Sequence, residues 1–273
     1  MTSAVGTETA PSVPLQVIHH CEPVMGTVVT IDIYSDETSS KAKLDQKLAE
    51  ARAVLQRADA VFSTWKPESP LSRLRRGELS VAQSPPEVAV VFEACAIARD
   101  ISRGWFDPWA MPGGVDPTGY VKGWAAQAAL DVLVGDGVAG AIVNAAGDIA
   151  SFGGVSNGQS FRVGILNPFS TRDLACVVEL NGAIATSGTY ERGNHLIDPN
   201  SQRRIARAAS ASVCGPDLGL ADALATALAI AGDAGLDFIA ELEGYDALVI
   251  SPDGWRWTDN FCFAPPFNSS SQQ

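Results

Sequence analysis

The chain has 273 residues, with 31 Asp and Glu against 19 Lys and Arg, and a formal net charge of −12. This negative balance disfavours a nucleic-acid-binding protein, because neutralising phosphates needs a basic surface. It equally disfavours attachment to anionic lipid by charge. Apolar residues make up 46% of the chain, which is enough to fill the core of a globular protein.

The interior of the sequence has no repeat and no Pro/Ser-rich linker, so we expect one domain over residues 15–267 with flexible tails at 1–14 and 268–273. We expect no transmembrane segment, because the most apolar stretch, Leu218–Ala240, contains three aspartates. The first residues have neither a basic start nor an apolar core, which predicts a cytoplasmic protein, or an exported one whose signal has been removed. Five scattered cysteines without a CxxC pair predict free thiols rather than a disulfide framework or a zinc cluster.

The first half of the chain mixes strand and helix patterns. Val24–Tyr34 is rich in β-branched residues and predicts a strand. Apolar residues at helical spacing predict amphipathic helices over Lys41–Phe62 and Pro86–Gly104. An irregular segment rich in Pro and Gly, residues 105–119, then leads into a predicted helix over Val121–Leu133.

The second half continues the mixture without a strict β–α alternation. The short strands predicted here are Ala141–Asn144, Phe161–Leu166 and Ala175–Leu180. A helix is predicted over Leu218–Ala231, with Asp217 as its N-cap and Gly232 as its stop. Residues 247–258 predict a closing hairpin around a Pro-Asp-Gly turn. This order of elements favours the α+β class, with a mixed, mainly antiparallel sheet and flanking helices.

Asp222 and Thr226 form a polar pair within the apolar helix. They are four residues apart, so the carboxylate and the hydroxyl project from one helix face. Hard oxygen ligands in this arrangement suit Mg²⁺. The alternative is structural, with Asp222 favoured by the helix dipole and Thr226 bonded back to a carbonyl oxygen.

A second polar group is Asp116–Gly123, where a loop enters the predicted helix. Backbone N–H groups at a helix start, with Lys122 beside them, form a natural anion site. The spacing is neither that of a Walker A loop nor that of GxGxxG. The alternative is a capped turn with a solvated lysine.

Two further polar segments lie between these. Thr186–Pro199 contains His195, which could act as a general base or hold an anion, or could be structural. No GxSxG elbow surrounds Ser187, so a serine nucleophile is disfavoured. Asn144–Asp148 predicts a sharp turn through Gly147, in which the Asp148 side chain would bond its own backbone.

These polar groups belong to a series of short motifs that extends from about Met25 to Gly232. The motifs are Val24–Thr27, Phe62–Trp65 with Ser69–Leu74, Phe106–Pro108, Asp116–Gly123, Asn144–Asp148, Gly164–Pro168, Ala185–Gly188, His195–Pro199 and Ala221–Thr226. In this number and order they resemble the ApbE family, the FAD:protein FMN transferases. Ala146 stands where the family has a glycine, which predicts a less tight turn at that point.

The resemblance implies an enzyme with Mg²⁺ as cofactor and FAD as substrate, which transfers FMN to a Ser or Thr of an acceptor flavoprotein and releases AMP. It implies that the Asp222 and Thr226 side chains and the Gly119 carbonyl ligand the metal. His195 would help to activate the acceptor hydroxyl. The residues implied to contact FAD are Met25, Phe106, Asp107, Asp116 and Lys122.

Two other functions are compatible with the same pocket. An FAD pyrophosphatase would transfer the phosphoryl group to water instead of to a protein. A non-catalytic flavin-binding protein would use Asp116 and Met25 without needing Asp222. The residues alone leave these alternatives open.

Overall fold

The computed structural model describes residues 16–35, 39–135, 137–155, 159–188, 196–205 and 207–265. The predicted tails and the predicted catalytic residue His195 lie outside these ranges.

All paired strands in the described chain run antiparallel to their neighbours, in a large sheet and a separate hairpin. The large sheet has the order β1 (Gln16–Val24), β2 (Thr27–Ser35), β3 (Gly140–Ala145), β4 (Asp148–Gly153), β7 (Gly182–Gly188), β8 (Ser210–Gly215), β9 (Asp246–Ser251) and β10 (Gly254–Trp257). The hairpin consists of β5 (Phe161–Asn167) and β6 (Ser170–Leu180). The predicted α+β class with a mainly antiparallel sheet is confirmed.

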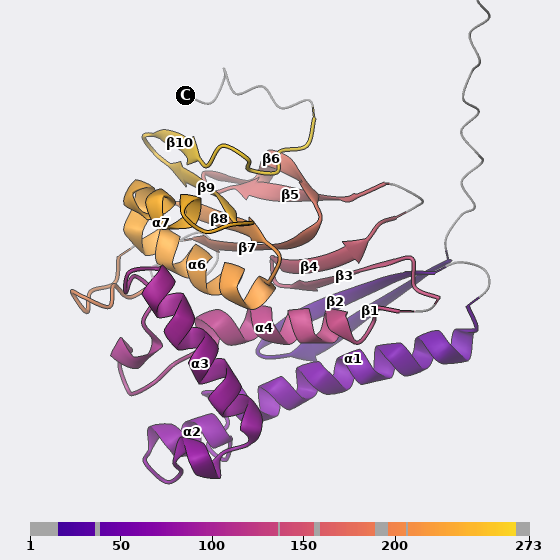
Figure 1. Cartoon of the computed structure of the whole chain (residues 1–273), viewed down its shortest axis with the longest axis horizontal. Helices are drawn as coiled ribbons and strands as arrows, with labels where there is room; N and C mark the ends of the chain where they lie inside the picture. The colour runs from indigo at the N-terminus through magenta and orange to yellow at the C-terminus, as the bar shows by residue number, and fades with distance from the viewer. Residues whose placement is uncertain are drawn as a thin grey trace, which may run out of the picture.

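The helices gather on one side of the large sheet, and the β5–β6 hairpin lies on the other (Figure 1). They are α1 (Lys41–Phe62), α2 (Pro70–Arg75), α3 (Pro86–Ile101), α4 (Thr118–Asp131), α6 (Leu218–Ala231) and α7 (Leu236–Ala240), with the short 3₁₀ turns η1 (Val81–Gln83), η2 (Pro108–Ala110) and η3 (Gly232–Gly235). Alternation along the strands separates the two cores: Ala183 and Ala185 face the helices, whereas Ile184 faces the hairpin.

Helix α6 is the central helix of the fold. Asp217 caps its start by accepting a hydrogen bond from the Leu220 amide (2.7 Å), and Gly232, at φ 66°, ends it, so both predicted boundaries are confirmed. It packs on β7, β8 and α4. At the crossing with α4, a Cβ added to Gly123 would lie 2.4 Å from the Leu218 carbonyl oxygen. Glycine at this position therefore brings the start of α4 directly against Asp222.

The stretch Leu218–Ala240 is more apolar than its three aspartates suggest. By length and apolar composition it could cross a membrane. In the fold, 67% of its most apolar window is buried, and the 3₁₀ turn η3 interrupts the helix from Gly232 onward. Burial in the core of this fold therefore explains why this stretch is so apolar.

Helix α1 is tied to β1 by a buried acid. Glu22 is 6% exposed and accepts hydrogen bonds from Arg52 Nε (2.6 Å), Gln56 Nε2 (2.8 Å) and His20 Nε2 (2.9 Å). These bonds, that from His20 first, lower the pKa of Glu22 to about 2. The carboxylate is thus held in its charged form where the helix meets the sheet.

Two turns differ from the predictions. The strand predicted over Val24–Tyr34 is broken by a hairpin turn, in which Met25 and Gly26 have φ values of 54° and 70°. The turn at Ala146–Gly147 is tight, because Ala145 pairs directly with Asp148 across it. Ala146 takes a left-handed φ of 55° that usually favours glycine, so the expectation of a looser turn was wrong.

Candidate active site

A cavity of about 820 Å³ opens where α4, α6 and β7 meet the β1–β2 turn. This volume falls within the range of small-molecule sites. Eight of the nine residues predicted for the site line it, and the ninth, His195, lies outside the described residues. The eight are Met25, Phe106, Asp107, Asp116, Gly119, Lys122, Asp222 and Thr226.

The three predicted metal ligands lie together at the crossing of α4 and α6. Asp222 is 6% exposed, and its Oδ2 accepts a hydrogen bond from the Gly123 amide (3.0 Å). In a regular helix that amide donates to the carbonyl oxygen of Gly119, so the carboxylate and this carbonyl compete for one proton. A Cβ added to Gly119 would lie 3.4 Å from Thr226 Oγ1. The carboxylate, carbonyl and hydroxyl groups thus belong to one small region.

The chemistry of these donors fits a hard cation. All three are oxygen atoms, and only one carries a formal charge. The described residues contain no group of three or more His, Cys, Asp or Glu side chains that could hold a metal ion. A cation here would therefore depend on neutral oxygens, water and a phosphate-bearing ligand, which is the usual environment of protein-bound Mg²⁺.

Lys122 lines the cavity but is engaged by the protein. Its ammonium group forms an ion pair with Asp148 Oδ2, a side chain that is only 1% exposed. Asp148 Oδ1 also accepts a hydrogen bond from the Thr186 amide (3.2 Å) on β7. Within the turn itself, Asn144 Oδ1 accepts a hydrogen bond from the Gly147 amide (2.8 Å), and a bond from Asp148 to its own turn stays a prediction.

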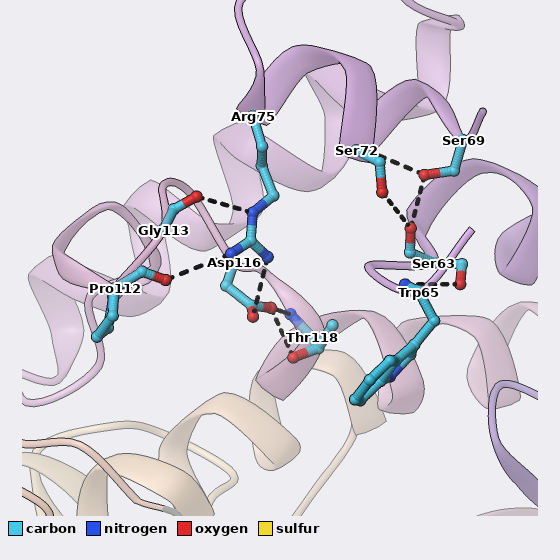
Figure 2. Close-up of polar contacts among 9 residues, drawn as sticks. All are labelled: Ser63, Trp65, Ser69, Ser72, Arg75, Pro112, Gly113, Asp116 and Thr118. Carbon is cyan, nitrogen blue, oxygen red and sulfur yellow. Dashed lines mark hydrogen bonds and ion pairs between the residues drawn. The ribbon is translucent and has the colours of Figure 1, made fainter. Parts of the chain in front are cut away.

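Asp116 is held at the entrance to α4 by a polar network (Figure 2). Its Oδ1 accepts hydrogen bonds from the Thr118 amide (3.1 Å) and hydroxyl (2.7 Å), and its Oδ2 lies 3.4 Å from the Arg75 guanidinium. Arg75 also donates to the carbonyl oxygens of Gly113 and Pro112. Asp116 therefore helps to shape the loop that borders the cavity, and a direct contact with a nucleotide stays a prediction.

Phe106 and Asp107 form another part of the wall. Phe106 is 5% exposed, and a Cβ added to Gly119 would lie 3.4 Å from its ring. Asp107 caps η2 by accepting from the Trp109 amide (2.9 Å) and pairs with Arg99 Nε (2.9 Å). In this structure the Asp107 carboxylate thus has partners that fix the wall.

The model of the ApbE family matches residues 25–113 and 110–249. This chain belongs to the ApbE family. A Rhodobacter capsulatus protein named FAD:protein FMN transferase is 34% identical over 150 residues, which are 51% of this chain and 28% of that protein. A Vibrio cholerae protein of the same name is 27% identical, with 92% of this chain and 93% of that protein covered.

Solved ApbE structures share the fold. The flavin transferase ApbE from Vibrio cholerae superposes with a TM-score of 0.77 at 21% identity, covering 90% of this chain and 97% of that one. The ApbE protein of Thermotoga maritima superposes with a TM-score of 0.75 at 19% identity, covering 89% and 97%. At these identities the likeness shows the fold, and roles of residues do not follow from it.

Trp65 of this ApbE-family chain lines the cavity but was given no role from the sequence. It is 92% exposed, in the loop that leaves α1. Ser63 holds this loop, since its Oγ accepts from the Trp65 amide (3.3 Å) and its carbonyl oxygen accepts from the Ser69 (2.6 Å) and Ser72 (3.1 Å) hydroxyls (Figure 2). The signal available in the sequence was a large aromatic residue three positions after the end of the helix predicted over Lys41–Phe62.

The segment after His195 also borders the cavity. Leu196 and Ile197 line it, as does Arg204, a cation with no role in the sequence-based prediction. Nearby Asp198 is 6% exposed; burial alone would raise its pKa, but hydrogen bonds from the Asn200 amide (2.9 Å) and from Ser201 outweigh this and lower it. Asp198 is thereby kept charged and holds the turn that follows.

Proposed function

We propose that this protein is a Mg²⁺-dependent FAD:protein FMN transferase, which attaches FMN through a phosphoester bond to a Ser or Thr of an acceptor flavoprotein and releases AMP. The carrying observation is the cavity in which Asp222, Thr226 and Gly119 lie together beside apolar walls. Family membership supports the same activity, since relatives named FAD:protein FMN transferase match most or part of the chain.

The proposed reaction is a phosphoryl transfer. The acceptor hydroxyl oxygen attacks the phosphorus on the FMN side of the FAD diphosphate, the bond from that phosphorus to the bridging oxygen breaks, and AMP leaves. The hydroxyl proton passes to a base, for which we propose His195. Such a transfer depends mainly on in-line positioning and on neutralising charge.

Asp222, Thr226 and the Gly119 carbonyl are proposed to hold Mg²⁺, which when bound offsets the negative charge of a diphosphate. The protein carries a net charge of −12, so local positive groups matter for admitting an anionic substrate. Lys66, Lys122 and Arg204 line the cavity, but Lys66 pairs with Asp59 and Lys122 with Asp148, so we propose that a bound Mg²⁺ would supply most of the local positive charge. We propose that Lys122 acts close to the diphosphate while Asp148 keeps it in place.

The apolar wall is proposed to take the rings of FAD. Phe106 is almost fully buried in this wall, Met25 lies at the β1–β2 turn, and Trp65 offers an exposed ring at the rim. Planar aromatic ligands pack well against such side chains. Asp107 and Asp116 border the same space and are proposed to contact FAD through the loops that they shape.

The test is incubation with FAD and Mg²⁺, with and without a candidate acceptor protein, followed by measurement of AMP and of covalently bound flavin. The proposal expects both products only when acceptor and metal are present together. AMP without modified protein would instead establish an FAD pyrophosphatase. Tight FAD binding with no AMP under either condition would establish a flavin-binding protein.

The role of His195 has its own test. Replacing His195 by Ala is expected to slow flavin transfer to the acceptor much more than it weakens FAD binding. Leu196 and Ile197, the next residues of the chain, line the cavity, which supports a role there. An equal loss of binding and transfer would make His195 a binding or structural residue.

A further inference from the structure

Three of the five cysteines gather on the sheet face opposite the helices. Cys176 of β6 and Cys214 of β8 are buried in the second apolar core, and half-buried Cys262 packs against it. The Sγ atoms of Cys214 and Cys262 are 2.8 Å apart. A disulfide bond is about 2.0 Å long, so the two sulfur atoms lie less than about 1 Å farther apart than they would in a disulfide.

The two cysteines belong to different layers of the fold. Cys214 lies in the large sheet, where it pairs with Ile184 of β7 and Asp246 of β9. Cys262 lies in the segment after β10, and its carbonyl oxygen accepts from the Glu179 amide of β6 (2.9 Å). A bond between their sulfurs would link the large sheet to the segment attached to the hairpin.

A second cavity, of about 290 Å³, gives access to this pair. Both cysteines line it, together with residues of the β6–β7 turn and the start of β9. It shares no lining residue with the larger cavity. A small reagent could therefore reach Cys262 without passing through the proposed flavin site.

The hydrogen bond between the thiols makes them chemically unequal. The bond lowers the pKa of the Cys262 thiol, whereas the same bond and then burial raise the pKa of the Cys214 thiol. The thiolate is the attacking species in thiol–disulfide exchange. Cys262, which is also the more exposed of the two, is thus the group suited to attack first.

We propose that Cys214 and Cys262 are a dithiol modification site, which a small-molecule disulfide such as oxidised glutathione converts to an intramolecular disulfide. The Cys262 thiolate attacks one sulfur of the reagent, forming a mixed disulfide and releasing one glutathione thiolate. The Cys214 sulfur then attacks the Cys262 sulfur, the mixed disulfide breaks, and a second glutathione leaves. Two protein thiols are oxidised and one reagent disulfide is reduced to two thiols, with the thiol protons going to solvent or glutathione.

The test uses the full chain with Cys21→Ser, because Cys21 is exposed and could react on its own. This variant keeps four of the five thiols. After incubation with oxidised glutathione, unfolding in the presence of a thiol reagent should count two free thiols, and peptide mapping should find Cys214 joined to Cys262. Four free thiols, or a crosslinked peptide containing Cys176, would overturn the proposal.

Two further variants in the same background separate the steps. Cys214→Ser should retain one glutathione on Cys262, because the thiol proposed to resolve the mixed disulfide is absent. Cys95→Ser is the matched control, since Cys95 is a buried thiol in the other core, and it should still lose two thiols. Absence of glutathione from Cys262 in the folded Cys214→Ser variant would contradict the proposed order of attack.

Discussion

Asp222→Asn is the sharpest perturbation of the proposed metal site. The change removes the one formal charge among the three proposed ligands and keeps the side-chain shape. The carboxylate is 6% exposed and accepts from the Gly123 amide at 3.0 Å. An Asn carbonyl oxygen can accept the same bond, so the free energy of unfolding should fall by only about 1 kcal/mol. Asp222→Ala would remove this hydrogen bond and buried side-chain volume together with the charge, so an effect on folding could not be separated from an effect on function.

The expected functional loss is much larger than the loss of stability. Removing one group that stabilises charge in a transition state typically costs about 100–1000-fold in rate, equivalent to about 3–4 kcal/mol. We therefore expect Mg²⁺-stimulated AMP release from FAD to fall by about that factor in Asp222→Asn. The rate would be measured over a range of Mg²⁺ concentrations, with urea unfolding on the same samples.

Asp217→Asn is the matched control. It changes the same functional group on the same helix, but Asp217 caps α6 outside the cavity, and Asn is as good an N-cap as Asp. This variant should keep both its activity and its stability. A near-wild-type rate for Asp222→Asn at saturating Mg²⁺, or equal losses in both variants, would refute the assignment of Asp222 as a metal ligand.

Three other predictions concern stability and are all measurable by urea unfolding. Lys122→Met should lower the free energy of unfolding by about 3–5 kcal/mol, because it removes the cation that pairs with the Asp148 carboxylate, whose side chain is 1% exposed. Adding Asp148→Asn should restore much of this stability. If the effects of the two substitutions were simply additive, the ion pair would be contradicted. Hydrogen bonds from His20 and two α1 side chains lower the pKa of Glu22 to about 2. The Glu22 carboxylate should therefore add about 1–3 kcal/mol to the free energy of unfolding above pH 4.5, and this contribution should disappear as the pH falls to about 2. Glu22→Gln should lack this pH dependence. Ala146→Gly should stabilise the protein by about 0.5–1 kcal/mol, since the residue has a φ of 55°; a loss of stability would argue against strain in that turn.

The elements that could be predicted from the sequence are those whose signals are local. Helix α1 has the predicted bounds, Lys41–Phe62, because its apolar positions repeat with the helical period over six turns. The bounds of α6 follow from its Asp217 cap and Gly232 stop in the same way. Strands β7 and β8 were missed, because they are rich in Ala, Ser and Gly, which carry no β-strand signal.

The composition of those missed strands has a tertiary cause. Helix α6 packs on both β7 and β8, and small residues such as Ala183, Ala185 and Ala211 on the helix-facing side permit its close approach. The same reasoning applies to Gly123, where only the absence of a side chain allows α4 to meet α6. The need for small residues at these positions depends on neighbours that are distant in the sequence, so it cannot be recognised from a short sequence window.

In the candidate site too, some features follow from local sequence and others from the tertiary structure. Residue types and short spacings, such as the i, i+4 spacing of Asp222 and Thr226, identified the chemical groups, because neighbours on a helix are placed by the backbone alone. The partners of those groups depended on the fold: Lys122 pairs with Asp148, Asp116 with Arg75, and Gly123 with Asp222, each across two elements. Local hydrogen bonding and periodicity act over a few residues and are encoded in order along the chain. Long-range pairing is selected only when packed helices and strands bring distant side chains within contact distance, so the tertiary structure alone decided which groups face the cavity and which hold its walls.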